Sequence, residues 1–136
     1  MPITGGCFCG ALRYEITGAI QMSGLCFCKT CQTLSGGAGN AFIGLDAGRF
    51  RYVAGAPATF THPAHENAPT REFCATCGTQ ISGRSAKAPS GMIVKLGTLD
   101  DPSVVSAPNM AFWVQEKQSF HCLPEGVKAY DSLPGC

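Results

Sequence analysis

The chain has 136 residues, a formal net charge of +1 at pH 7 and only 14% charged residues. This length fits a single domain that can bury a core, and an apolar share of 45% excludes disorder for the chain as a whole. The near-neutral charge argues against binding to the nucleic-acid backbone, which requires a basic surface. The unusual feature is a set of nine cysteines, which needs a chemical explanation.

Short strands are predicted along most of the chain, because apolar residues alternate with polar ones over four or five positions between glycines and prolines. In chain order the predicted strands are 12–16, 41–45, 50–53, 58–61, 71–74, 80–83, 92–96 and 112–114, with a last edge strand at 127–130. A helical turn is predicted at 29–34, and another begins at Asp100-Asp101-Pro102. We therefore expect one mainly β domain of short antiparallel strands over residues 1–136, with its core at about 5–130.

The chemistry of the cysteines depends on the compartment. The first residues show no positively charged stretch followed by an apolar one, so no secretory leader is expected. No segment approaches the roughly 18 apolar residues of a membrane span. We therefore expect a cytoplasmic protein without membrane contact, whose cysteines stay reduced and bind metal or act in catalysis.

Seven of the nine cysteines fall into three clusters, and their number divides naturally as four plus three. The clusters are Cys7 with Cys9, Cys26 with Cys28 and Cys31, and Cys74 with Cys77, whereas Cys122 and Cys136 stand alone. Zinc takes four protein ligands in a closed structural site and three in an open catalytic one. The count therefore predicts two zinc ions per chain.

The two cysteine pairs have the local geometry of half-sites. The two-residue spacing of Cys74 and Cys77 lets the chain fold back, and Gly78 can adopt the positive φ that such a turn requires. Cys7 and Cys9 lie on one side of an extended segment. We predict that the two pairs together close one four-cysteine site.

The middle cluster supplies three cysteines from six consecutive residues, with no obvious fourth ligand. A helix start beside them, with Lys29 nearby, would favour the thiolate form. Three protein ligands without a fourth are typical of an open zinc site. The alternative is a second closed site completed by Cys122, His121 or His65.

Other residues are given structural roles. His62 and His65 lie in a polar, proline-containing loop and are expected at the surface, while His121 and Cys122 are expected at a packed edge. Trp113 is expected in the core or in a pocket wall.

Two basic residues and the last cysteine complete these expectations. Arg71 and Lys117 could receive a ligand carboxylate, although a solvated surface position is the default for both. Cys136 is expected to be a free thiol at a disordered terminus.

Five segments carry a family resemblance. They are GCFCGALRYE at 6–15, CFCKTC at 26–31, FCATCGT at 73–79, GTLDDP at 97–102 and FWVQEK at 112–117. In this order they resemble the glutathione-dependent formaldehyde-activating enzyme family, which includes the centromere protein V type of domain. The similarity extends over roughly residues 5–130.

The resemblance implies a β-tent-like (Gfa-like) domain organised around two zinc sites. It assigns Cys7, Cys9, Cys74 and Cys77 to a structural zinc, and Cys26, Cys28 and Cys31 to a catalytic one. The activity it implies is the condensation of glutathione with formaldehyde to S-(hydroxymethyl)glutathione, which is a carbon–sulfur lyase reaction in reverse. The expected partner is thus a small thiol such as glutathione; no nucleic acid is expected, and the oligomeric state is not indicated.

The chain departs from the family at Phe27, where members often carry histidine, and at Phe120, where tryptophan is common. Neither change removes a zinc ligand, but Phe27 would remove a hydrogen-bonding group beside the open site, which leaves the substrate undetermined. Two other functions remain: a non-enzymatic zinc scaffold that binds a protein, and a redox protein using Cys28-Lys29-Thr30-Cys31. The second lacks the βαβ pattern of thioredoxin-like proteins.

Overall fold

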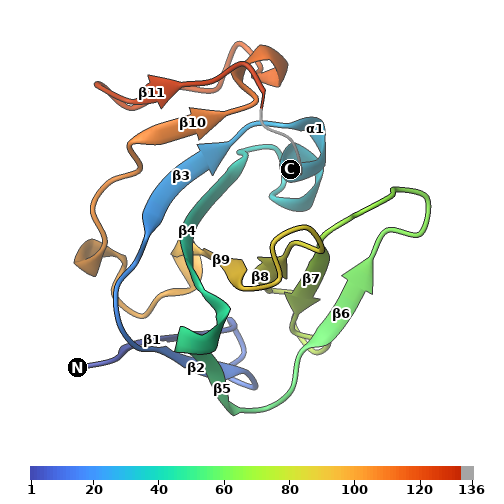
Figure 1. The fold of residues 1–136 in the computed structure, drawn as a ribbon, viewed down its shortest axis with the longest axis vertical. Coiled ribbons are helices and arrows are strands. Elements are labelled where there is room, and N and C mark those ends of the chain that lie inside the picture. The colour runs from blue at the N-terminus through green and yellow to red at the C-terminus, as the bar shows by residue number, and fades with distance from the viewer. Residues whose placement is uncertain (133–136) are drawn as a thin grey trace.

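The computed structural model describes residues 1–132 and is mainly β, as the sequence predicts (Figure 1). The strands are β1 Ile3–Gly6, β2 Arg13–Ile16, β3 Met22–Cys26, β4 Asn40–Asp46, β5 Phe50–Ala54, β6 Ala58–Thr61, β7 Thr70–Phe73, β8 Gln80–Arg84, β9 Gly91–Lys95, β10 Met110–Phe112 and β11 Lys128–Ala129. One α-helix, α1, spans Lys29–Leu34, and four 3₁₀ turns are η1 Ala47–Arg49, η2 Leu96–Thr98, η3 Pro102–Val104 and η4 Val114–Glu116. None of the helices described is long and apolar enough to cross a bilayer.

The strands form two sheets. The smaller has the order β1-β2-β5, and the larger has the order β11-β10-β3-β4-β9-β8-β7-β6. The pairs are antiparallel except where β10 runs parallel to β3 and to β11. Figure 1 shows the small sheet at one end of β3 and β4 and α1 at the other.

The alternation along β4 separates the core from a second face of the large sheet. Ile43 and Leu45 are buried in the main core, which also contains Tyr14 of β2 and Val94 of β9. Burying each such aliphatic side chain contributes about 1.5–3 kcal/mol. The alternate β4 residues Asn40, Phe42 and Gly44 point to the other face.

Most of the predicted strands and the turn at 29–34 are confirmed, but β1 and β3 were not predicted. In β3, Ser23 and Gly24 interrupt the apolar alternation that marks a strand. Gly24 is needed there for packing, because a Cβ at this position would lie 3.0 Å from the Phe42 ring and 3.3 Å from that of Phe112. Its small size, which weakens the strand signal, is what lets the aromatic rings approach.

The strand predicted at 112–114 is β10, and it begins and ends earlier than expected. It ends at Phe112 because Trp113 adopts a left-handed φ of 56° and Val114 starts a 3₁₀ turn. A left-handed conformation is uncommon for a bulky residue and is costly unless its surroundings hold it.

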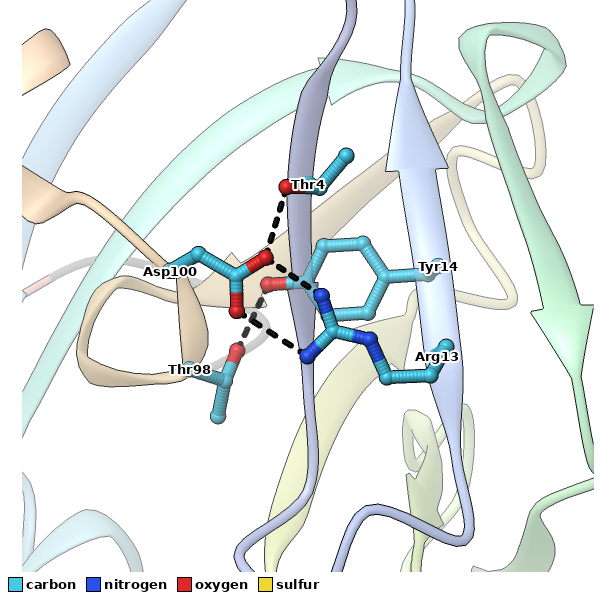
Figure 2. A network of polar contacts seen from close by, with 5 residues as sticks. All are labelled: Thr4, Arg13, Tyr14, Thr98 and Asp100. Atoms are coloured by element: carbon cyan, nitrogen blue, oxygen red, sulfur yellow. Dashed lines mark hydrogen bonds and ion pairs between the residues drawn. The ribbon is translucent and has the colours of Figure 1, made fainter.

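A polar network joins the small sheet to the segment after β9 (Figure 2). Asp100 receives both terminal nitrogens of Arg13, one of them at 2.9 Å, and the hydroxyl of Thr4 at 2.6 Å. The buried Tyr14 hydroxyl lies 2.8 Å from that of Thr98, which itself donates to the carbonyl of Lys95. Because the single hydroxyl proton of Thr98 goes to Lys95, Tyr14 donates to Thr98, and burial raises the pKa of Tyr14 to about 12.

Replacing Asp100 with asparagine tests this network. Hydrogen bonds from Arg13 and then Thr4 hold the pKa of Asp100 below its ordinary value. The stabilisation is therefore present above the unfolded-state pKa and is lost as the pH falls through the lower folded-state pKa. We expect Asp100→Asn to lower the free energy of unfolding at pH 7 by about 1 kcal/mol, a figure kept small because the pair is solvent-exposed.

Denaturant unfolding of both proteins from pH 7 to pH 2 measures this effect. The two stabilities should converge at the acid end, where the carboxylate of the wild type is protonated. Glu125→Gln, at an exposed position without an ion pair among residues 1–132, is the control. A constant gap across the whole pH range would contradict an electrostatic role for Asp100.

Candidate functional site

Four cysteines from two distant turns meet in one cluster. Cys7 and Cys9 follow β1, and Cys74 and Cys77 lie between β7 and β8. Their sulfur atoms all lie within 4.8 Å of one another, with 3.6 Å between Cys7 and Cys9 and 3.8 Å between Cys9 and Cys74. Tetrahedral zinc with Zn–S bonds of about 2.3 Å places sulfurs about 3.8 Å apart, so this donor set is consistent with zinc.

Local backbone geometry shapes this cluster. Gly78 adopts a φ of 79°, as its place after Cys77 led us to expect. Thr79 links the two turns, because its hydroxyl accepts the N–H of Phe8 and lies 3.1 Å from the sulfur of Cys77. The hydrogen bond from the Thr79 side chain lowers the pKa of Cys77 to about 5, which favours the metal-binding thiolate at neutral pH.

Three more cysteines meet where β3 passes into α1. Cys26 is the last residue of β3, Cys28 is the N-cap of α1, and Cys31 lies in the first turn. All three are buried and their sulfur atoms lie within 4.8 Å of one another. This group is also consistent with a bound metal ion, and its sulfur donors suit zinc.

The start of α1 polarises this second cluster. The backbone N–H of Cys31 donates to the sulfur of Cys28 at 3.3 Å. A hydrogen bond from the Cys31 side chain lowers the pKa of Cys28 to about 6, and the same contact, together with burial, raises the pKa of Cys31. Cys28 therefore favours the thiolate form at neutral pH, whereas Cys31 favours the protonated thiol.

Two residues that the sequence interpretation missed hold α1 in place. Gln32 is buried and donates from Nε2 to the carbonyls of Phe27 and Glu116, both at 2.8 Å. The Glu116 carboxylate accepts the N–H of Lys29 at 3.2 Å. The sequence feature that could have indicated this role is the FWVQEK segment. Its Glu116 bonds to Lys29 of α1, which lies 87 residues earlier in the chain.

The candidates for a fourth ligand lie elsewhere. Within residues 1–132, no further cysteine, histidine or carboxylate joins the group of three. His121 is packed and buried: its Nδ1 accepts the N–H of Gln118 at 2.9 Å and its Nε2 contacts the Gly37 carbonyl. His65 lies beside His62, with the two rings tilted, in the exposed loop after β6, as expected, and Cys122 is exposed. Cys136 lies outside the described residues.

A cavity of about 380 Å³ opens beside the three-cysteine cluster, with Cys26 and Cys31 in its wall. This volume is within the roughly 300–1,000 Å³ of small-molecule sites. The strand register places one row of residues along its wall, namely Met22, Gly44, Ile93, Gly83 and Arg71. Paired residues of adjacent strands share a face, so the cavity lies over the large sheet.

Lys29, the positive charge that the sequence places near the three-cysteine cluster, is not the one that acts on it in the structure. Lys29 is exposed and donates to the Thr33 hydroxyl one turn along α1. The charges that act on Cys31 are instead those of Lys95 and Arg71. Lys95 donates to Asn40 Oδ1 at 2.8 Å, and burial lowers its pKa.

Arg71 is partly buried in the cavity wall and not simply solvated, whereas Lys117 donates to the carbonyls of Gln118 and His121. The sequence interpretation weighed both as carboxylate receptors, and only Arg71 is placed for that role.

Phe27 and Phe120, the two positions at which the sequence differs from the family pattern, do not line the cavity. Phe27 is buried with its ring 5.1 Å from that of His121, and Phe120 is exposed. Phe27 therefore does not line this cavity, and the loss of a hydrogen-bonding group beside the three-cysteine site stays a prediction. Trp113 packs against the three-cysteine cluster, and its neighbour Phe112 lines the cavity.

Comparisons with known proteins identify the fold and the family of the chain. A crystal structure of a Rhodobacter sphaeroides protein from a structural-genomics programme superposes with a TM-score of 0.62 at 19% identity, covering 78% of this chain and 97% of that one. At this identity the likeness shows a shared fold. The family model described as glutathione-dependent formaldehyde-activating enzyme matches residues 2–116. Because that match takes in most of the sequence, the chain belongs to the glutathione-dependent formaldehyde-activating enzyme family.

Proposed function

We propose that this protein is a zinc-dependent enzyme that adds a thiol to an aldehyde, with glutathione and formaldehyde as the reference substrates of its family. The observation that carries the proposal is the position of Cys26 and Cys31, which belong to a metal-competent cluster and also line a substrate-sized cavity. A purely structural zinc module would not need a cavity at its metal site. Catalysed in reverse, the reaction is that of a carbon–sulfur lyase.

The two cysteine clusters divide the work in this proposal. Cys7, Cys9, Cys74 and Cys77 would hold a structural zinc, since four sulfurs saturate the ion. Cys26, Cys28 and Cys31 would hold the second zinc beside the cavity. A four-cysteine zinc site stabilises the fold by about 10–16 kcal/mol at neutral pH in small zinc domains.

The residues around the second cluster serve the addition reaction. A zinc ion bound there supplies Lewis acidity toward the aldehyde oxygen and affinity for a thiolate. Gln32 and Glu116 keep α1, and with it Cys28 and Cys31, in a fixed position. The cation of Lys95 stabilises negative charge at the cluster. In the balanced reaction the sulfur–carbon bond forms and the thiol proton ends on the former carbonyl oxygen.

The metal content tests the division into two sites. We expect two zinc ions per chain in the wild type and one in Cys31→Ser, whose fold should persist because the four-cysteine site is intact. Cys74→Ser should instead lose much of its thermal stability, since that site joins turns 65 residues apart. Elemental analysis after gel filtration, with thermal unfolding of each variant, measures both effects. A wild type that holds a single zinc would contradict the proposal.

Activity can be followed by exchange NMR of glutathione and formaldehyde at equilibrium with S-(hydroxymethyl)glutathione. We expect the zinc-loaded wild type to accelerate exchange above the spontaneous rate, and Cys31→Ser to lose at least tenfold of that acceleration. Cys122→Ser is the matched control, because it removes an exposed cysteine outside both clusters. Full acceleration by Cys31→Ser would exclude the cluster as the reaction centre.

Gln32→Leu tests the support of the second site. It removes both hydrogen bonds that join α1 to the neighbouring backbone, and loss of such outer contacts typically weakens metal affinity 10–100-fold. Competition with a chromophoric chelator should show one zinc released more readily and the other unchanged. Gln115→Leu, at an exposed neighbouring position, should behave as wild type. Equal release of both ions from Gln32→Leu would show a general loss of stability instead.

A further inference from the structure

The cavity beside Cys26 and Cys31 is much larger than formaldehyde requires. One of the sheet positions that face it, Gly83, carries no side chain, and this absence leaves part of the space open. A Cβ at Gly83 would lie 3.4 Å from Ile93, which is ordinary van der Waals contact, so a larger residue could fit there. At Gly83 the space is therefore set by the choice of residue and not by a backbone conformation that requires glycine.

The wall of the cavity is mostly apolar. Met22, Phe42, Ile93 and Phe112 supply much of it, and they extend from the middle of the large sheet to the cysteine cluster. Such a wall favours a hydrocarbon body over a hydrated polar one, because burying a polar group without a hydrogen-bond partner is costly. The part of the substrate that occupies the cavity should thus be apolar.

One charge interrupts the apolar wall. Arg71 is the single charged residue among the described residues that line the cavity, and no carboxylate in residues 1–132 forms an ion pair with it. Lys95, the other cation near Cys31, already donates to Asn40. An unpaired guanidinium favours a carboxylate, which it can bind through two parallel hydrogen bonds.

Glutathione does not match this lining. Glutathione carries two carboxylates and an ammonium group. Among residues 1–132, those that line the cavity include one cation and no acidic residue that could pair with the ammonium. Its thiol would therefore approach the cluster from outside the cavity, and the space inside remains for the aldehyde.

We propose that the aldehyde substrate of this protein carries an apolar chain that ends in a carboxylate. This inference rests on the proposed function. The carboxylate pairs with Arg71, the chain lies against Phe42 and Ile93, and the carbonyl end reaches Cys26 and Cys31. The thiol adds across the carbonyl, so that a sulfur–carbon bond forms and the thiol proton moves to the oxygen, with no oxidant or reductant required.

Isothermal titration with hexanoate and 1-hexanol tests the cavity directly. The two ligands have the same number of carbon atoms in an unbranched chain, and only hexanoate is charged. We expect hexanoate to bind the wild type on the order of tenfold tighter than hexanol. Arg71→Gln should abolish this preference, and Arg51→Gln, at an exposed arginine of the small sheet, should keep it. Gly83→Val should weaken both ligands by filling the space. Equal binding of the two ligands to the wild type would overturn the inference.

Turnover separates this inference from the proposed function. With glutathione as the thiol, exchange NMR should show stronger acceleration for 6-oxohexanoate than for hexanal, and Arg71→Gln should bring the two rates together. Acceleration with formaldehyde but not with 6-oxohexanoate would overturn the inference and leave the proposed function intact. Lack of acceleration with every aldehyde would contradict the proposed function and the inference with it.

Discussion

The convergence of four cysteines from opposite parts of the chain is the constraint on which the rest of this structure depends. The turn after β1 and the turn between β7 and β8 meet at these sulfurs, although Cys9 and Cys74 are 65 residues apart in the sequence. Most strands here are only four or five residues long, so few of them could define a register alone. Fixing both turns holds the small sheet beside the end of the large one.

The segments that resemble the family contain one of the cysteine clusters or residues that hold a cluster in place. Arg13 and Tyr14 of the first segment bond to Asp100 and Thr98 of the fourth, which fastens the small sheet beyond the cysteines (Figure 2). Glu116 of the last segment supports α1, which bears the second cluster. The segments that resemble the family thus include residues that position the cysteines as well as the cysteines themselves.

Sequence reasoning was most successful where chemistry is local. Cysteines separated by one or two residues bring their sulfurs together through the backbone alone, so each pair and the group of three could be predicted from spacing. The joining of the two pairs was predicted from the number of ligands that a closed zinc site needs. Strand β3 could not, because Gly24 and Ser23 hide its pattern. Arg71 could be placed in the cavity wall only through pairing across five strands, since register is set by the whole sheet and not by the residues beside Arg71.

Gly83 in the cavity wall separates two properties that many active sites combine. The cysteines form the candidate metal site, whereas the missing side chain at Gly83 sets how much room the cavity has. Mutation at Gly83 can therefore alter substrate range without touching a metal ligand or a strained backbone position. Under the proposed function, single substitutions at this position would change which aldehydes are accepted and leave the reaction chemistry unchanged.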